Sequence, residues 1–264
     1  MKTEFLLKQG FSHGFRLINV RSSCILLPHP LNSGRSQSMN QHDPNVISYL
    51  GLRKAVGIIG CALPFLLIIG RWFTKGFGFE PTISDYYYTN MGDVFVGCMC
   101  AIGIFLMSVR GFDLRDKTAG HVACIFAIMV AFFPTKDKSG ALVEPKYISM
   151  VHITSAALLF ITLAYFCLCQ FTKTSSQGPS RRKLQRNNVY RTCGIIILSS
   201  IFLIALCNLV SLITRRDLLA QYKPGLILES LAIEAFGFAW LTKGEAILKD
   251  EQQPQSLKRQ SAGA

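Results

Sequence analysis

The sequence predicts an all-α polytopic membrane protein, a bundle of six transmembrane helices with both termini in the cytoplasm. Half of the 264 residues are hydrophobic and 16% are charged, whereas a soluble domain carries roughly 25% charged residues. The apolar residues form six continuous runs, without the alternation that is typical of a transmembrane β-barrel. Because Lys and Arg lie between and outside these runs, the net charge of +13 does not indicate a nucleic-acid partner.

The two ends of the chain differ from its middle. The first 38 residues are basic and rich in Ser, and residues 17–27 are too interrupted by polar side chains to form the apolar core of a signal peptide. We predict that residues 1–47 form a disordered basic extension, with a true start at Met39; a targeting presequence is the alternative. We predict a disordered cytoplasmic tail over residues 247–264.

The transmembrane domain is predicted over residues 48–246. The first run holds Pro64 near its middle, the second follows Asp93, and the third ends at Pro134. The second, third and sixth runs are short against the roughly 20 residues that a bilayer requires. We therefore expect loop residues to extend them or neighbouring helices to shield them. The six spans are expected at about residues 54–73, 93–110, 119–134, 147–171, 192–214 and 225–242.

Glycines along three of these runs indicate close packing between helices, because small residues let membrane helices approach one another. They are Gly57, Gly60 and Gly70 in the first run, Gly97 and Gly103 in the second, and Gly237 in the sixth.

The distribution of basic residues predicts the orientation. With the N-terminus inside, twenty of the 28 Lys and Arg lie on the inner segments and eight on the outer ones. The segment 172–191, with Arg181, Arg182, Lys183 and Arg186, contributes strongly to this difference. The positive-inside rule then places both termini in the cytoplasm. The same segment is also typical of a contact with anionic lipid.

This orientation brings polar residues from separate segments to the outer side of the membrane. A charge in hydrocarbon costs several kcal/mol, so acids and an imidazole there predict a polar or coordinated chamber. We expect Asp85, His152 and Glu229 to lie within about one side-chain length of each other. The ligand-binding candidates are Asp85, Tyr86, Asp93, His152, Asn208, Glu229 and Glu234.

Several of these candidates also have structural interpretations. His152 can bond a neighbouring helix, Glu229 can form a structural lock, and the run Tyr86–Tyr88 is typical of an interfacial aromatic belt. Glu234 follows Glu229 by five residues, so the two point about 140° apart around a helix. One of them is therefore expected to be protonated or to face a partner subunit, which leaves a homo-oligomer open.

The catalytic candidates are Ser84, Asp85, His152 and Glu229. Zinc is the cofactor to consider, with Asp85, His152 and Glu229 as ligands, because catalytic zinc takes three protein ligands and a water. His152 is the one His expected on the outer side, and no HExxH, GxSxG or Walker motif is present. Ser84 adjoins Asp85, and His152 is the side chain that could serve as its base.

Two segments resemble a group of uncharacterised bacterial six-helix membrane proteins. The first reads ISDYYYT-x-MGDVFVG and the second ESLAIEAFGFAWLTKGE. Ile83–Asp85, His152–Ala156 and Phe236–Gly244 carry the resemblance, which covers about residues 48–246. It implies a multi-pass protein of the bacterial inner membrane and brings no established activity.

A more distant likeness is to the DRAM/FRAG-type and ceramidase-like membrane families. The DRAM/FRAG-type proteins also carry an ISD-type loop between their first two spans. The ceramidase-like proteins use a Ser, an Asp and three His around zinc. This chain lacks the pair of His expected on a late helix and carries Glu229 and Glu234 there instead.

Three functions follow as hypotheses, all with membrane lipids as the surrounding partners. The first is a non-enzymatic protein whose outer-leaflet polar pocket binds a lipid or small amphiphile, which the incomplete catalytic set favours. The second is a metal-dependent hydrolase that modifies lipids, which bound zinc lost in His152→Ala would support. The third is a proton-coupled transporter that uses Glu234, which a pH-dependent flux abolished by Glu234→Gln would support.

Overall fold

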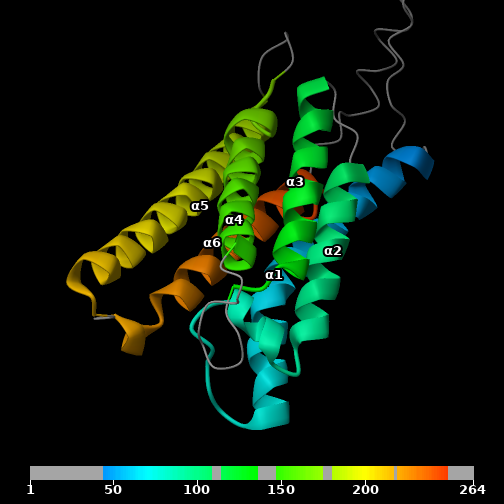
Figure 1. The fold of residues 1–264 in the computed structure, drawn as a ribbon. Coiled ribbons are helices and arrows are strands. Elements are labelled where there is room, and N and C mark those ends of the chain that lie inside the picture. Colours follow the sequence, from blue (N-terminus) through cyan, green and yellow to red (C-terminus); the bar gives the residue numbers. More distant parts are fainter. Residues whose placement is uncertain (1–43, 109–113, 136–146, 175–179, 217–218, 249–264) are drawn as a thin grey trace, which may run out of the picture. The chain divides into compact units, whose positions relative to one another are not determined.

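The computed structural model describes residues 44–108, 114–135, 147–174, 180–216 and 219–248, all within the unit Met39–Ala264. These residues form six α-helices and no strand (Figure 1). The helices are α1 (Pro44–Lys75), α2 (Gly92–Ser108), α3 (Leu114–Phe132), α4 (Tyr147–Tyr165), α5 (Arg181–Thr214) and α6 (Pro224–Lys243). A π-turn, Phe166–Gln170, continues α4, and two 3-10 turns, η1 (Ser84–Tyr88) and η3 (Ala220–Tyr222), lie between helices.

The all-α prediction is confirmed for the described residues, and four helices are long and apolar enough to cross a membrane. Those four segments are Tyr49–Lys75, Tyr147–Gln170, Arg181–Thr214 and Pro224–Lys243. Helix α2 is apolar but has 17 residues. In helix α3 the polar residues 115–118 follow Leu114, so its apolar part is short as well. The count of six spans therefore stays a prediction.

Two helix starts differ from the predicted boundaries. Helix α1 begins at Pro44, inside the range predicted as disordered, because a proline at the first helical position has a preset φ and lacks a donor that the helix would not use. Helix α5 begins at Arg181 rather than near residue 192, because the Ser180 side chain accepts a hydrogen bond from the Lys183 N–H and caps the helix. The predicted extension up to residue 43 and the tail from residue 249 lie outside the described residues.

The helices form a closed circuit of contacts in chain order. Each helix packs against the next, and α6 packs against α1 (Figure 1). Consecutive helices run in opposite directions, so one end of the bundle holds the C-terminal ends of α1, α3 and α5 with the N-terminal ends of α2, α4 and α6. Because η1 lies there, this is called the η1 end; the other is the opposite end.

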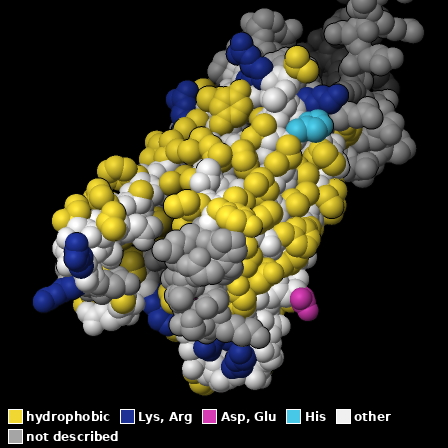
Figure 2. Space-filling view, in the orientation of Figure 1, with side chains coloured by type: hydrophobic (Ala, Val, Ile, Leu, Met, Phe, Trp, Pro, Cys, Tyr) yellow, Lys and Arg dark blue, Asp and Glu magenta, His cyan; other side chains and the backbone are white. Residues whose placement is uncertain are grey.

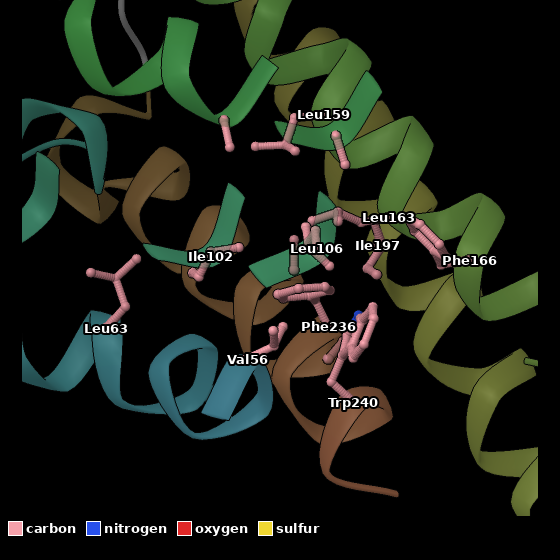
Figure 3. Packing of buried hydrophobic residues seen from close by; sticks show 14 of the residues in the cluster. Val56, Leu63, Ile102, Leu106, Leu159, Leu163, Phe166, Ile197, Phe236 and Trp240 are labelled. Carbon is pink, nitrogen blue, oxygen red and sulfur yellow. The ribbon is translucent and has the colours of Figure 1, made fainter. Parts of the chain in front are cut away.

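The core lies between the helices and is built from apolar side chains. Trp240 on α6 is 1% exposed, and its ring contacts those of Phe166, Phe171 and Phe236 at centroid distances of 5.1–6.1 Å. Such edge-on aromatic pairs add to the free energy of burial. Figure 3 shows Phe166, Phe236 and Trp240 together with Val56, Leu63, Ile102, Leu106, Leu159, Leu163 and Ile197.

Glycines set the approach of α1 and α6. A Cβ at Gly57 would lie 2.7 Å from the Leu241 backbone nitrogen, and a Cβ at Gly237 would lie 2.7 Å from the Cys61 backbone nitrogen. Backbone atoms cannot yield as a flexible side chain can, so only glycine fits at these positions. The prediction that glycines serve helix packing is confirmed for this pair of helices and for Gly103, whose Cβ would lie 3.2 Å from that of Ala127 on α3. It is wrong for Gly97, whose Cβ would meet no neighbouring helix of the described residues within 4 Å.

The outward faces of the helices are strongly apolar. On α5, only 11% of the most apolar 18-residue stretch is buried. Phe202, Leu212 and Ile213 on this helix are each at least 67% exposed. Figure 2 shows apolar side chains over the middle of the visible face, with Lys and Arg toward the ends of the helices. Apolar faces of this extent suit contact with lipid or with a partner helix.

Candidate functional site at the η1 end

The turn η1 is attached to α6 by three hydrogen bonds. The Leu226 N–H donates to the Pro81 carbonyl oxygen at 2.8 Å. Oε2 of Glu229 accepts from the Ile83 N–H at 2.8 Å and from the Ser84 N–H at 3.4 Å. The first N–H groups of a helical turn have no partner within the turn, and they favour a negative charge. Glu229 therefore caps η1 from another helix, a role that differs from the predicted pairing with His152 or a loop Lys.

His152 holds the same turn from α4. Its side chain is 2% exposed, and its Nδ1 bonds the Phe133 carbonyl oxygen at the end of α3. A carbonyl oxygen only accepts, so Nδ1 carries the hydrogen. In the neutral ring Nε2 is then the acceptor, and the Ser84 hydroxyl donates to it at 3.0 Å. His152 thus joins α3, α4 and η1.

Asp85 lies in the middle of this arrangement. Its carboxylate is close enough for its charge to act on His152. Its N–H donates to the Thr82 Oγ1 at 3.1 Å, which fixes the start of the turn. Ser84 and Asp85 are half-buried, and Oδ2 of Asp85 is itself buried. The structure brings Ser84, Asp85, His152 and Glu229 together around one turn.

Tyr86 is part of the core rather than of a ligand site. Its side chain is fully buried, and burial raises the pKa of the phenol above its ordinary value of 10.0. Tyr87 and Tyr88 are half-buried and their rings meet edge-to-face at 5.0 Å. The aromatic-belt interpretation therefore suits these two residues and not Tyr86.

Three other candidates lie apart from this site. Asp93 is exposed in the first turn of α2, where a negative charge suits the helix dipole. Asn208 is exposed on α5. Glu234 lies further along α6 beside α1, where the Cys61 thiol is 4.0 Å from its carbonyl oxygen. The expectation that Asp93 and Asn208 join the polar cluster is wrong, because the rotation of each helix turns them outward.

The zinc hypothesis finds no ligand set. Among the described residues, no group of three or more His, Cys, Asp and Glu is placed to hold a metal ion. The donors have other partners: Nδ1 of His152 bonds Phe133, its Nε2 bonds Ser84, and Oε2 of Glu229 bonds two backbone N–H groups. Asp85, His152 and Glu229 therefore do not form a zinc site, and the hypothesis is not carried further.

The chemistry that the site does offer is a nucleophile beside a base. Ser84 and His152 have the hydrogen bond of such a pair, and the Phe133 carbonyl orients the imidazole. The nearest backbone donors are engaged, because the N–H groups of Ile83 and Ser84 bond Glu229 and that of Asp85 bonds Thr82. An oxyanion would find no free donor among these three groups.

Sequence reasoning missed two groups that build this site. One is the Thr82 hydroxyl, which accepts from the Asp85 N–H. The spacing Thr82-x-x-Asp85 is typical of a capping hydroxyl followed by an acid, so the sequence could have predicted this role. The sequence could not indicate the Phe133 carbonyl as a partner of His152, because every residue has a backbone carbonyl whatever its side chain.

Comparison with family models, with curated proteins and with solved structures finds no match to this chain. The resemblance to bacterial six-helix membrane proteins therefore stays a prediction. Function has to be argued from the residues of the η1 end.

Proposed function

We propose that this protein is a multi-pass protein of the bacterial inner membrane that binds the polar head of an amphiphile at Ser84 and Asp85. The observation that carries the proposal is the polar cluster of Ser84, Asp85, His152 and Glu229 at the end of otherwise apolar helices. Polar groups at such a depth are kept where they meet a ligand or each other. His152 and Glu229 position η1. Ser84 and Asp85 are half-buried residues of this turn, and they contact the ligand.

The carboxylate of Asp85 favours a head group that donates hydrogen bonds. Asp85 and Asp93 contribute carboxylates there, and Glu80 is paired with Arg71 at 2.5 Å. A carboxylate accepts hydrogen bonds and attracts a cation, so Asp85 suits an ammonium or hydroxyl head and disfavours a carboxylate head. The amphiphile class that we propose is therefore an alkyl amine or amino alcohol.

Photo-crosslinking tests this proposal. The full chain in nanodiscs is exposed to a photoactivatable alkyl amine and, separately, to a fatty acid of the same length, and the labelled peptides are mapped. We expect stronger labelling by the amine near residues 81–91, and its loss in Asp85→Asn. The matched control is Asp93→Asn, which removes an exposed carboxylate at the same end. Equal labelling by both probes, or unchanged labelling of Asp85→Asn, contradicts the proposal.

A second candidate is a metal-free lipid hydrolase, which the Ser84–His152 hydrogen bond favours. Here the Ser84 Oγ attacks an ester carbonyl while its proton passes to Nε2 of His152 and then to the leaving alcohol. Water next releases the acid from the acyl-serine, which restores the hydroxyl. The engaged N–H groups of residues 83–85 count against it, unless η1 rearranges on binding substrate.

A fluorophosphonate probe separates the two candidates, since it reacts with activated serines. Labelling of the wild type that is lost in Ser84→Ala and retained in Ser149→Ala supports the hydrolase. Absence of labelling at Ser84, together with specific crosslinking by the amine, supports the binding protein.

We further propose that the η1 end faces the periplasm and that both termini are cytoplasmic, on the basis of the basic residues of the opposite end. Alkaline phosphatase is active only outside the cytoplasm. Fused after residue 90 it should be active, and fused after residue 246 it should be inactive. The reverse pattern overturns the orientation.

A further inference from the structure

The opposite end of the bundle gathers basic side chains from three helices. Lys243 ends α6, Arg53 lies near the start of α1, and Lys183 and Arg186 lie in the first turns of α5. All four side chains are half-buried. The charges of Arg53, Lys183 and Arg186 each act on Lys243, so all three lie within electrostatic reach of this side chain. They are called the basic cluster below.

Specific contacts hold the basic cluster in place. Nζ of Lys183 donates to the Phe171 carbonyl oxygen at 2.7 Å, and Nζ of Lys243 lies 5.4 Å from the centre of the Phe171 ring. One residue therefore holds two of the cations. Arg53 is placed by the end of α6, because a Cβ at Gly244 would lie 3.3 Å from its Cβ.

Two acids of the described residues act on the basic cluster. The charge of Asp116 acts on Lys243, and that of Glu245 acts on Arg53. Asp116 also pairs with Lys173 at 2.7 Å, so part of its charge is already used. Like charges about 4 Å apart repel by about 1 kcal/mol per pair in water and by more when water is partly excluded. Basic residues that served only to orient the protein in the membrane would not need to converge. They could stay exposed to solvent, as Arg181 does.

We infer that the basic cluster binds a phosphoryl group, carried by an anionic lipid head or by a soluble phosphate compound. The observations that carry this inference are the convergence of four cations from α1, α5 and α6, the contacts of Lys183 and Lys243 with Phe171, and the place of Arg53 beside Gly244. Guanidinium groups bind phosphate oxygens in pairs and ammonium groups add charge, so the cluster has both kinds of donor. This site is separate from the η1 end and does not depend on the amphiphile proposal.

Thermal unfolding of the full chain in nanodiscs tests the inference. One comparison sets phosphatidylglycerol discs against phosphatidylcholine discs. The other adds pyrophosphate to phosphatidylcholine discs, against chloride at the same ionic strength. Binding to the folded state raises the Tm, and we expect a rise of at least about 2 °C in one comparison. A rise only with phosphatidylglycerol identifies a lipid head group; a rise with pyrophosphate identifies a soluble phosphate ligand.

Variants separate a site from general electrostatics. Lys243→Gln should lose most of the rise, and its Tm in chloride should equal or exceed that of the wild type because repulsion is relieved. Arg186→Gln should give the same result, which keeps the test valid if one variant fails to fold. The matched control is Arg181→Gln, with the same change of charge on α5, and it should keep the full rise. No rise in either comparison, or equal loss in the control, overturns the inference.

Discussion

Ser84 and His152 lie 68 positions apart in the chain and share a hydrogen bond of 3.0 Å between Oγ and Nε2. The bond depends on a second one, because the Phe133 carbonyl oxygen holds the hydrogen of the neutral imidazole on Nδ1. A single buried side chain thus connects the turn before α2 to the end of α3. The same geometry is required whether Ser84 binds a head group or attacks an ester.

Replacement of His152 should destabilise the protein more than replacement of Ser84. His152→Leu leaves the Phe133 carbonyl and the Ser84 hydroxyl without this partner, at a cost of about 1–3 kcal/mol for each group that stays unsatisfied. Ser84→Ala leaves only the imidazole Nε2 affected. Thermal unfolding of both single variants and of the double variant measures the coupling. Additive effects would show that the hydrogen bond does not contribute to stability.

Glu229 should act mainly as a hydrogen-bond acceptor for η1. Glu229→Ala removes the acceptor of the Ile83 and Ser84 N–H groups, whereas Glu229→Gln keeps an oxygen and loses only the charge, worth about 0.3–1 kcal/mol at a helix N-terminus. Hydrogen exchange at these two amides should therefore increase strongly in Glu229→Ala and slightly in Glu229→Gln. Glu234→Gln is the control, since Glu234 does not bond this turn, and its exchange there should be that of the wild type.

The contact between α1 and α6 should not accept a methyl group. Gly237→Ala places a Cβ 2.7 Å from the Cys61 backbone nitrogen, and overpacking of this kind costs about 1–3 kcal/mol. Gly97→Ala is the matched control, because no atom lies within 4 Å of its Cβ. The free energy of unfolding of Gly97→Ala should equal that of the wild type or exceed it by up to about 1 kcal/mol. Equal unfolding midpoints for the two variants would show that the helices separate at little cost.

Burial of Tyr86 should make the protein sensitive to alkaline pH. Its pKa is raised in the folded state from the ordinary 10.0, so the unfolded chain releases this proton first as the pH rises. The contribution to stability is present below pH 10 and is lost as the pH rises toward the folded pKa. Tyr86→Phe should therefore lose less Tm between pH 9 and pH 11 than the wild type. Tyr222→Phe, at an exposed position, should follow the wild type.

How far the candidate site was predictable varies from residue to residue. His152 and Glu229 stand out in the sequence because an imidazole and a carboxylate within apolar runs need partners, and both have them. Asp93 and Asn208 are also polar residues predicted on the outer side, yet both are exposed. A span boundary has an uncertainty of a few residues, and one residue turns a side chain by about 100° around a helix. Depth is therefore predictable where direction is not.

The sequence by itself determined that the described chain is helical, that its helices include apolar ones suited to a membrane, and that polar residues among them need partners. Only the tertiary structure decided which partners those are. The hydropathy of a segment is a sum over neighbouring residues, so a prediction based on it tolerates a small error in the position of the segment. The bonds of His152 with Ser84 and with the Phe133 carbonyl depend on the rotation and translation of separate segments, which packing sets through contacts between residues far apart in the chain.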